Sequence, residues 1–166
     1  MVKTKPKFGF SLIEILVVIG IIGILATVVY AALGSVRIRS RDTKRKYDIS
    51  QIGRFMSLSC FLPSSGGGEY DLADLAAELL VANPQYQQYL KKVPEDPKSG
   101  TAAQTNYTYI ITADGQKCAL YANLENKNET ITLSNLTDPT PGGGNGVLSG
   151  TTTGANNTNI YYQYSN

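Results

Sequence analysis

The residue whose chemistry stands out is Glu14, the one charged side chain in the 24 residues from Phe10 to Leu33. A carboxylate at mid-depth in a bilayer costs about 2.5–3.5 kcal/mol on insertion scales. The side chain could avoid this cost by reaching the membrane interface or by taking up a proton. Alternatively, it could pair with a cation. Cutting the chain between Gly9 and Phe10 would create one, an α-amine four residues from Glu14.

The apolar run from residue 10 to 33 must be the helix that positions this carboxylate. At about 1.5 Å per residue it spans about 36 Å, more than the ~30 Å of a bilayer's hydrocarbon core. A secretory signal peptide has a shorter apolar core followed by a small-residue cleavage site, whereas the small residues here are scattered. A plain membrane anchor is the other alternative. Six basic residues follow the run and three precede it, so the positive-inside rule would place the C-terminal domain in the cytoplasm. Yet that domain has the polar composition of an exported surface.

The residues around this carboxylate follow a recognisable order. Lys7-Phe8-Gly9 precedes Phe10-Ser11-Leu12-Ile13-Glu14, and the apolar run comes next. This succession closely resembles the prepilin signature of type IV pilins and of type II secretion pseudopilins. In that family a prepilin peptidase on the cytoplasmic side cuts after the glycine and methylates the new N-terminal residue. The resemblance therefore implies a leader peptide over 1–9, cleavage between Gly9 and Phe10, and N-methylation of Phe10.

The resemblance also implies a role for Glu14 and a location for the protein. Glu14 would neutralise the terminal amine of a neighbouring subunit during assembly. The precursor would be a single-pass protein of the cytoplasmic (inner) membrane, with prepilin peptidase and the assembly machinery as partners. The processed chain would join a helical homopolymer. That polymer would be either an extracellular type IV pilus, supporting adhesion, twitching motility or DNA uptake, or a pseudopilus in the cell envelope. A membrane-anchored surface binding protein is a further alternative.

The apolar pattern continues beyond residue 33 and predicts one helix from about Phe10 to Phe61. Its first half, 10–33, is hydrophobic, and its second half, 34–62, is amphipathic and should pack on a globular head. Pro63 and the glycine-rich loop after it should end the helix. Many type IV pilins carry a proline near the position of Ala31, and this chain has none, so it lacks that helix breaker.

A basic run follows the apolar segment. Arg37, Arg41 and Arg45 share one helical face, and Asp42 precedes Lys46 by the four residues of a favourable ion pair. The run is interpreted as a solvated face. Alternatively it could contact acidic groups of other subunits or anionic lipid. Contact with DNA is a third hypothesis, weakened because no aromatic residues are interleaved with the run.

The head, residues 63–166, is expected to be one α+β domain with a small antiparallel sheet, the pilin fold. Helices are predicted from 71 to 80 and from Pro84 to 92. The segments 106–111 and 117–124 should form a hairpin around the turn at 113–116, and 160–164 should form a last strand. Irregular polar loops with one or two strands should fill 126–166. The loop Pro94-Glu95-Asp96-Pro97 before a Tyr-rich strand is similar to one in major pseudopilins.

The two cysteines, Cys60 and Cys118, lie 58 residues apart, a spacing that fits neither a zinc motif nor a CxxC motif. In an oxidising compartment they should pair as a disulfide, and two buried free thiols are the alternative. The strand around Cys118 would lie against the end of the long helix, which favours the disulfide.

Residues for catalysis are missing from the sequence. The chain has no histidine, no glycine-rich phosphate loop and no nucleophile beside a base, so we expect no enzyme and no cofactor. Asp96 and Asp114 are weak candidates for a calcium site in loops, but their spacing matches no EF-hand. Solvated turn carboxylates are the simpler interpretation of both.

Overall fold

The computed structural model describes residues 11–58, 60–82, 84 and 92–166, and it divides the chain into two compact units, Met1–Arg37 and Ile38–Asn166. The leader peptide, Gly9 and Phe10 lie outside the described residues, as does most of the helix predicted to start at Pro84. The elements are α1 (Leu12–Leu58), β1 (Gly68–Asp71), α2 (Leu72–Ala82), β2 (Tyr107–Ile111), β3 (Cys118–Asn123), β4 (Gly146–Ser149) and β5 (Ile160–Ser165).

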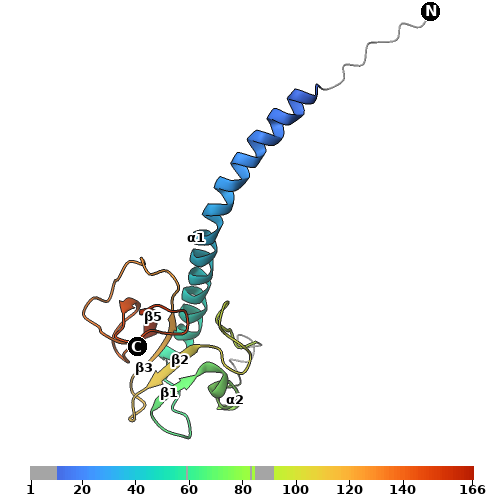
Figure 1. The fold of residues 1–166 in the computed structure, drawn as a ribbon. Helices are drawn as coiled ribbons and strands as arrows, with labels where there is room; N and C mark the ends of the chain where they lie inside the picture. Colours follow the sequence, from blue (N-terminus) through green and yellow to red (C-terminus); the bar gives the residue numbers. More distant parts are fainter. Residues whose placement is uncertain (1–10, 59, 83, 85–91) are drawn as a thin grey trace, which may run out of the picture. The chain divides into compact units, whose positions relative to one another are not determined.

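In the second unit the five strands form one antiparallel sheet in the order β1-β2-β3-β5-β4 (Figure 1). The predicted hairpin is confirmed, with Tyr107 opposite Ala122 and Ile111 opposite Cys118. The predicted last strand is also confirmed, and it pairs with both β3 and β4. The α+β architecture, a long N-terminal helix with a small antiparallel sheet, is therefore as the sequence predicted.

The strand β1 was not predicted, because it lies where the expected glycine-rich loop ends at Gly68 and the expected helix begins at Asp71. This strand is only four residues long and pairs with β2, with Glu69 opposite Ile110. The next element then begins at once, because the Asp71 carboxylate accepts the Ala73 N–H at 2.9 Å and caps α2. So short a segment has no periodicity of its own, and its strand conformation depends on the neighbouring strand.

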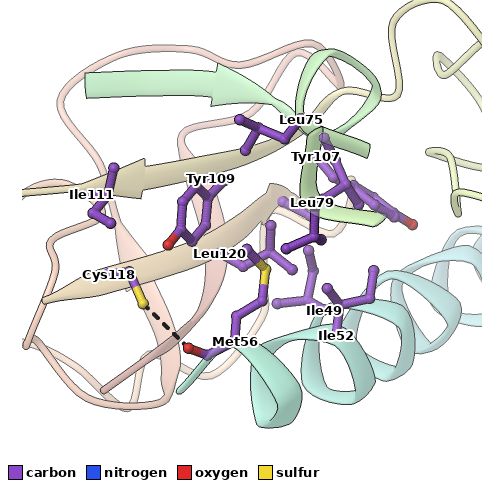
Figure 2. Packing of buried hydrophobic residues seen from close by; sticks show 12 residues of the cluster. Ile49, Ile52, Met56, Leu75, Leu79, Tyr107, Tyr109, Ile111, Cys118 and Leu120 are labelled. Atoms are coloured by element: carbon purple, nitrogen blue, oxygen red, sulfur yellow. Dashed lines mark hydrogen bonds between the residues drawn. The ribbon is translucent and has the colours of Figure 1, made fainter. Parts of the chain in front are cut away.

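The core lies between one face of the sheet and the two helices of the second unit. Alternate residues of β2 and β3 point into it, and α1 adds Ile49, Ile52 and Met56 (Figure 2). Gly53 permits close packing of α1 on β5, since a Cβ there would lie 2.6 Å from the Tyr164 side chain. The amphipathic half of α1 therefore packs on the sheet.

A disulfide joins the segment just after α1 to β3. Cys60 and Cys118 are bonded, with their Cα atoms 5.7 Å apart. The adjacent residue is also held, because the Tyr109 hydroxyl accepts the Phe61 N–H at 2.9 Å and donates to the Phe61 carbonyl at 3.0 Å. The structure therefore contains the pairing that the sequence favoured and fastens the chain where the long helix has ended.

Candidate functional site: the assembly helix and the Arg45 cluster

Glu14 lies in the first turn of α1 and is held there by Ser11. Its Oε2 atom accepts the Ser11 N–H at 2.8 Å, and the Glu14 N–H donates to the Ser11 carbonyl at 3.1 Å. Ser-x-x-Glu is the sequence of a capping box, in which the acid satisfies the N–H of the capping residue. A negative charge is also favourable at the positive end of the helix dipole. The carboxylate is therefore fixed at the start of the helix, within the segment that cleavage after Gly9 would leave at the N-terminus.

The side chains that follow Glu14 are exposed and apolar. Leu12 is 82% exposed and Tyr30 is 81% exposed. The intervening exposed residues include Ile13, Ile15, Leu16, Val17, Val18, Ile19, Ile21, Ile22, Ile24, Leu25, Val28 and Val29. Apolar surface in water is unfavourable by roughly 25 cal/mol per Å². By length and composition, α1 is the helix among the described residues that could cross a membrane. This segment therefore has the length and the exposed apolar surface that lipid or another protein could cover.

Two glycines interrupt the apolar surface of this segment. An added Cβ at Gly20 or Gly23 would meet no atom within 4 Å. Small residues on a membrane helix allow another helix to approach its backbone closely. The helix continues without a break through residues 30–32, where many type IV pilins carry a proline.

The basic run is the predicted solvated face only in part: Arg37, Arg39 and Lys44 are exposed, whereas Arg45 is not. Arg45 is fully buried, and its guanidinium contacts three carboxylates. It bonds Asp96 through Nε to Oδ2 at 2.6 Å and Nη2 to Oδ1 at 2.9 Å. Its Nη1 lies 2.6 Å from Asp42 Oδ1 and 2.8 Å from Glu125 Oε1. The reason is that Arg45 lies on the core side of the amphipathic helix, and a charge buried there must be paired.

Two further cations complete this group. Arg41 binds Glu125 with both ends of its guanidinium, at 2.6 and 2.7 Å, and Lys98 Nζ lies 3.3 Å from the same carboxylate. We call these six residues the Arg45 cluster: Arg41, Asp42, Arg45, Asp96, Lys98 and Glu125. Three cations meet three carboxylates, so the formal charges balance. The cluster ties α1 to the loops around residues 96 and 125.

The predicted ion pair between Asp42 and Lys46 is wrong. Besides contacting Arg45, Asp42 accepts the Glu125 N–H at 2.9 Å and the Asn126 N–H at 2.8 Å. Lys46 instead forms an ion pair with Glu129. Glu125, Asn126 and Glu129 all lie in the segment that follows β3. The tertiary fold places this segment against the face of α1 that contains Asp42 and Lys46.

These contacts shift the acidity of the cluster. The hydrogen bond from Arg41 lowers the pKa of Glu125 to about 2, with Arg45 acting in the same direction. Burial alone would raise the pKa of Asp96, but the bond from Arg45 and those from Ser99, Asn156 and Lys98 hold it well below its usual range. Burial would lower the pKa of Arg45, yet its carboxylate partners raise it above its ordinary value. At neutral pH Glu125 and Asp96 are therefore ionised and Arg45 is protonated.

The two weak calcium candidates lie in different environments. Asp96 binds Arg45 with both oxygens, and Asp114 lies in the β2–β3 turn, where Oδ1 accepts the Thr112 hydroxyl at 2.5 Å and the Gln116 N–H at 3.0 Å. In the part of the chain that the structure describes, no three acidic, cysteine or histidine residues are grouped so that they could hold a metal ion.

Sequence reasoning missed Glu125 altogether and did not predict that Arg45 is buried. One local signal existed, because Asp42 lies three residues before Arg45 and so on the same helix face. Asp96 and Glu125 are 51 and 80 residues further along the chain, and no spacing rule connects them to the helix.

The first unit is the part of the chain that matches a known protein family. Residues 4–30 match the family described as the prokaryotic N-terminal methylation motif. A search of curated proteins found no match, and neither did a search of solved structures. The match spans the predicted cleavage position, Glu14 and most of the exposed apolar helix. The chain thus carries the prepilin signature of type IV pilins and pseudopilins, which implies processing by a prepilin peptidase and assembly into a pilus or pseudopilus.

Proposed function

We propose that this chain is a structural subunit of a type IV pilus, made as a membrane-anchored precursor and assembled through its N-terminal helix. The observation that carries the proposal is the exposed apolar surface of α1 directly behind the methylation motif. A lone subunit leaves this surface uncovered. Lipid covers it in the precursor, and the helices of other subunits cover it in a filament.

Processing supplies the charge that Glu14 needs. The peptidase hydrolyses the peptide bond between Gly9 and Phe10, which frees the Phe10 α-amine, and methylation leaves that amine able to carry a positive charge. Opposite charges attract strongly at low dielectric, and either one left unpaired there is costly. The carboxylate is already oriented at the helix start by Ser11. In assembly Glu14 neutralises the amine of a neighbouring subunit, which fixes the axial register between the two helices.

The head supplies the outer surface of the filament and does no chemistry of its own in this proposal. The Arg45 cluster and the disulfide hold the second half of α1 to the sheet and to the loops around it. The chain is thus a substrate of processing enzymes rather than a catalyst. Adhesion, twitching motility or DNA uptake would follow from the polymer.

A second candidate is a major pseudopilin of a type II secretion system. The observation that favours it is the Pro94-Glu95-Asp96-Pro97 loop, whose carboxylate anchors the loop to Arg45. In this case the same helix packing would produce a short filament within the cell envelope.

The decisive experiment measures the intact mass and N-terminal sequence of the protein in two fractions, the filaments sheared from the cell surface and the cell envelope. A chain that begins at methylated Phe10 and is abundant in the sheared fraction supports the pilus subunit. The same processed chain confined to the envelope supports the pseudopilin. A chain that still begins at Met1 in cells with an active prepilin peptidase would refute both, and would favour a membrane-anchored surface binding protein.

A further inference from the structure

A groove of ≈310 Å³ opens on the face of the sheet that does not carry the core. Thr108 and Tyr121 lie opposite each other on β2 and β3, and they alternate with the core residues Tyr109 and Leu120. Successive side chains of a strand point to opposite faces, so Thr108 and Tyr121 face away from the helices. The volume is at the lower end of the roughly 300–1,000 Å³ of small-ligand pockets.

Two tyrosine rings form one wall of this groove. Tyr121 and Tyr161 pack edge to face, with centroids 5.9 Å apart and an interplanar angle of 78°. Tyr161 is buried, and its hydroxyl donates to the Thr152 carbonyl at 3.2 Å. The buried ring is therefore held in place and supports the half-buried Tyr121. A supported aromatic ring offers apolar contact area with little entropy to lose on binding.

Polar groups with unused hydrogen-bonding capacity surround the rings. The carboxamide of Gln104 has no partner among the residues that the structure describes. The Asp71 Oδ1 atom accepts bonds from the Ala73 N–H and from the Thr105 N–H and hydroxyl. Among the described residues, Oδ2 accepts only the Asn106 N–H, at 2.9 Å. A carboxylate oxygen has room for a second donor.

The Tyr121 hydroxyl can also act as a donor. It is hydrogen-bonded by the Thr108 side chain, and burial raises its pKa to about 12, so it keeps its proton at neutral pH. Because a hydroxyl both donates and accepts, its O–H can also donate to a ligand in the groove. Along one wall, then, lie a hydroxyl donor, a carboxamide that both donates and accepts, and a carboxylate acceptor.

The charge of the groove excludes several ligand classes. Its described lining contains the Asp71 carboxylate and no lysine or arginine, and Glu69 adds negative potential at Tyr121. Nucleic acids and anionic lipids bind where basic side chains neutralise phosphates. The lining instead suits a neutral molecule with neighbouring hydroxyl groups and an apolar C–H face.

We propose that this groove binds a neutral saccharide unit, whose ring lies on Tyr121 and whose hydroxyls bond to Gln104, Asp71 and the Tyr121 hydroxyl. The inference concerns the head alone and does not depend on which filament the chain builds. It gives the head an affinity for neutral glycans.

The test is saturation-transfer NMR on the full-length chain in a phosphocholine detergent, which carries no sugar of its own. The probes are methyl β-D-galactopyranoside, methyl α-D-mannopyranoside and N-acetyl-D-glucosamine. Transfer to the ring protons of at least one probe is expected. Gln104→Ala and Tyr121→Phe should each weaken binding about fivefold, the effect of one net hydrogen bond.

Gln116→Ala is the matched control, because it removes an exposed carboxamide at the other end of the same hairpin and should leave binding unchanged. Both test variants remove only an exposed amide or a single hydroxyl, and a circular dichroism spectrum checks that they fold. Absence of transfer to all three saccharides would overturn the proposal. Equal transfer in the wild type and both test variants would also overturn it, since the sugar would then bind elsewhere. Binding of a thymidine hexanucleotide that Tyr121→Ala abolishes would reassign the groove to nucleic acid, because bases stack on the aromatic ring.

Discussion

Arg45 and Asp96, 51 residues apart in the chain, meet through two parallel hydrogen bonds of 2.6 and 2.9 Å in a fully buried site. The guanidinium of Arg45 uses its remaining end on Asp42 and Glu125. Through this one side chain the second half of α1 is joined to the loop at residue 96 and to the segment that follows β3.

Arg45→Ala should destabilise the head strongly. The substitution leaves Asp42, Asp96 and Glu125 close together without their shared cation, and breaking a buried ion pair costs about 3–5 kcal/mol. Urea unfolding of the full-length chain in detergent measures the loss. Lys44→Ala is the control, because Lys44 pairs with Asp48 at 3.3 Å on the surface and such pairs contribute at most about 1 kcal/mol. Equal effects of the two substitutions would contradict the role assigned to Arg45.

The stability of the head should fall in acid. The folded-state pKa of Glu125 is lowered to about 2 and that of Asp96 is lowered further, so folding favours their ionised forms. Their contribution is fully present above the unfolded-state pKa of about 4 and is lost as pH falls through the folded values. For Glu125 the loss is on the order of 3 kcal/mol. Unfolding free energies measured between pH 7 and pH 2 should decline below about pH 5, and Glu125→Gln should flatten part of that decline.

Loss of the disulfide should lower the free energy of unfolding of the head. The bond closes a loop across a sequence separation of 58 residues, for which the chain-entropy relation predicts about 4 kcal/mol. The measurement compares urea unfolding of the oxidised wild type with that of the Cys60→Ala/Cys118→Ala double variant. Reducing agent should lower the stability of the wild type and leave the double variant unaffected. A wild type indifferent to reduction would show that the bond does not form in the protein as it is made.

Gly53→Ala should be destabilising although alanine is the better helix former. The added Cβ would lie 2.6 Å from Cβ, Cγ and Cδ1 of Tyr164, so helix and strand must move apart. Overpacking of this kind costs about 1–3 kcal/mol. Gly34→Ala is the matched control, because its Cβ meets open space and the substitution should strengthen the helix by up to about 1 kcal/mol. Thermal unfolding followed by circular dichroism compares the two, and opposite signs are expected.

Glu14→Ala should separate membrane insertion from assembly. The variant keeps the apolar helix, so its amount in the membrane fraction should match that of the wild type. It lacks the carboxylate proposed to neutralise the neighbouring amine, so the yield of sheared filaments should fall at least about tenfold, which is the effect of losing roughly 1.4 kcal/mol at one contact. Immunoblots of the two fractions provide the measurement. Glu14→Asp keeps the charge and should retain part of the filament yield. A normal filament yield from Glu14→Ala would contradict the proposed role of Glu14 in assembly.

Much of the fold could be predicted from local patterns. Three patterns of neighbouring residues were informative: the apolar run, the alternation around Tyr107 and Tyr121, and the turn at 113–116. The long helix and the hairpin lie where these patterns predict them. The strand β1 could not be predicted in this way. Its four residues adopt a strand because β2 offers hydrogen-bonding partners, and that information lies forty residues away.

The sequence by itself determined the N-terminal unit: the methylation motif, the placement of Glu14 in the first turn and the length of the apolar helix all depend on consecutive residues. Only the tertiary structure decided which charged side chains of the head are buried and with which partners they pair. Arg45 reads as one cation among several in a basic run, yet it is buried because Asp96 and Glu125 arrive from distant loops to balance it. The Tyr121 groove likewise exists only where β1, β2, β3, β5 and the loops beside them meet. Pairing of buried charges and the shape of a surface depend on contacts between distant residues, which no local spacing records.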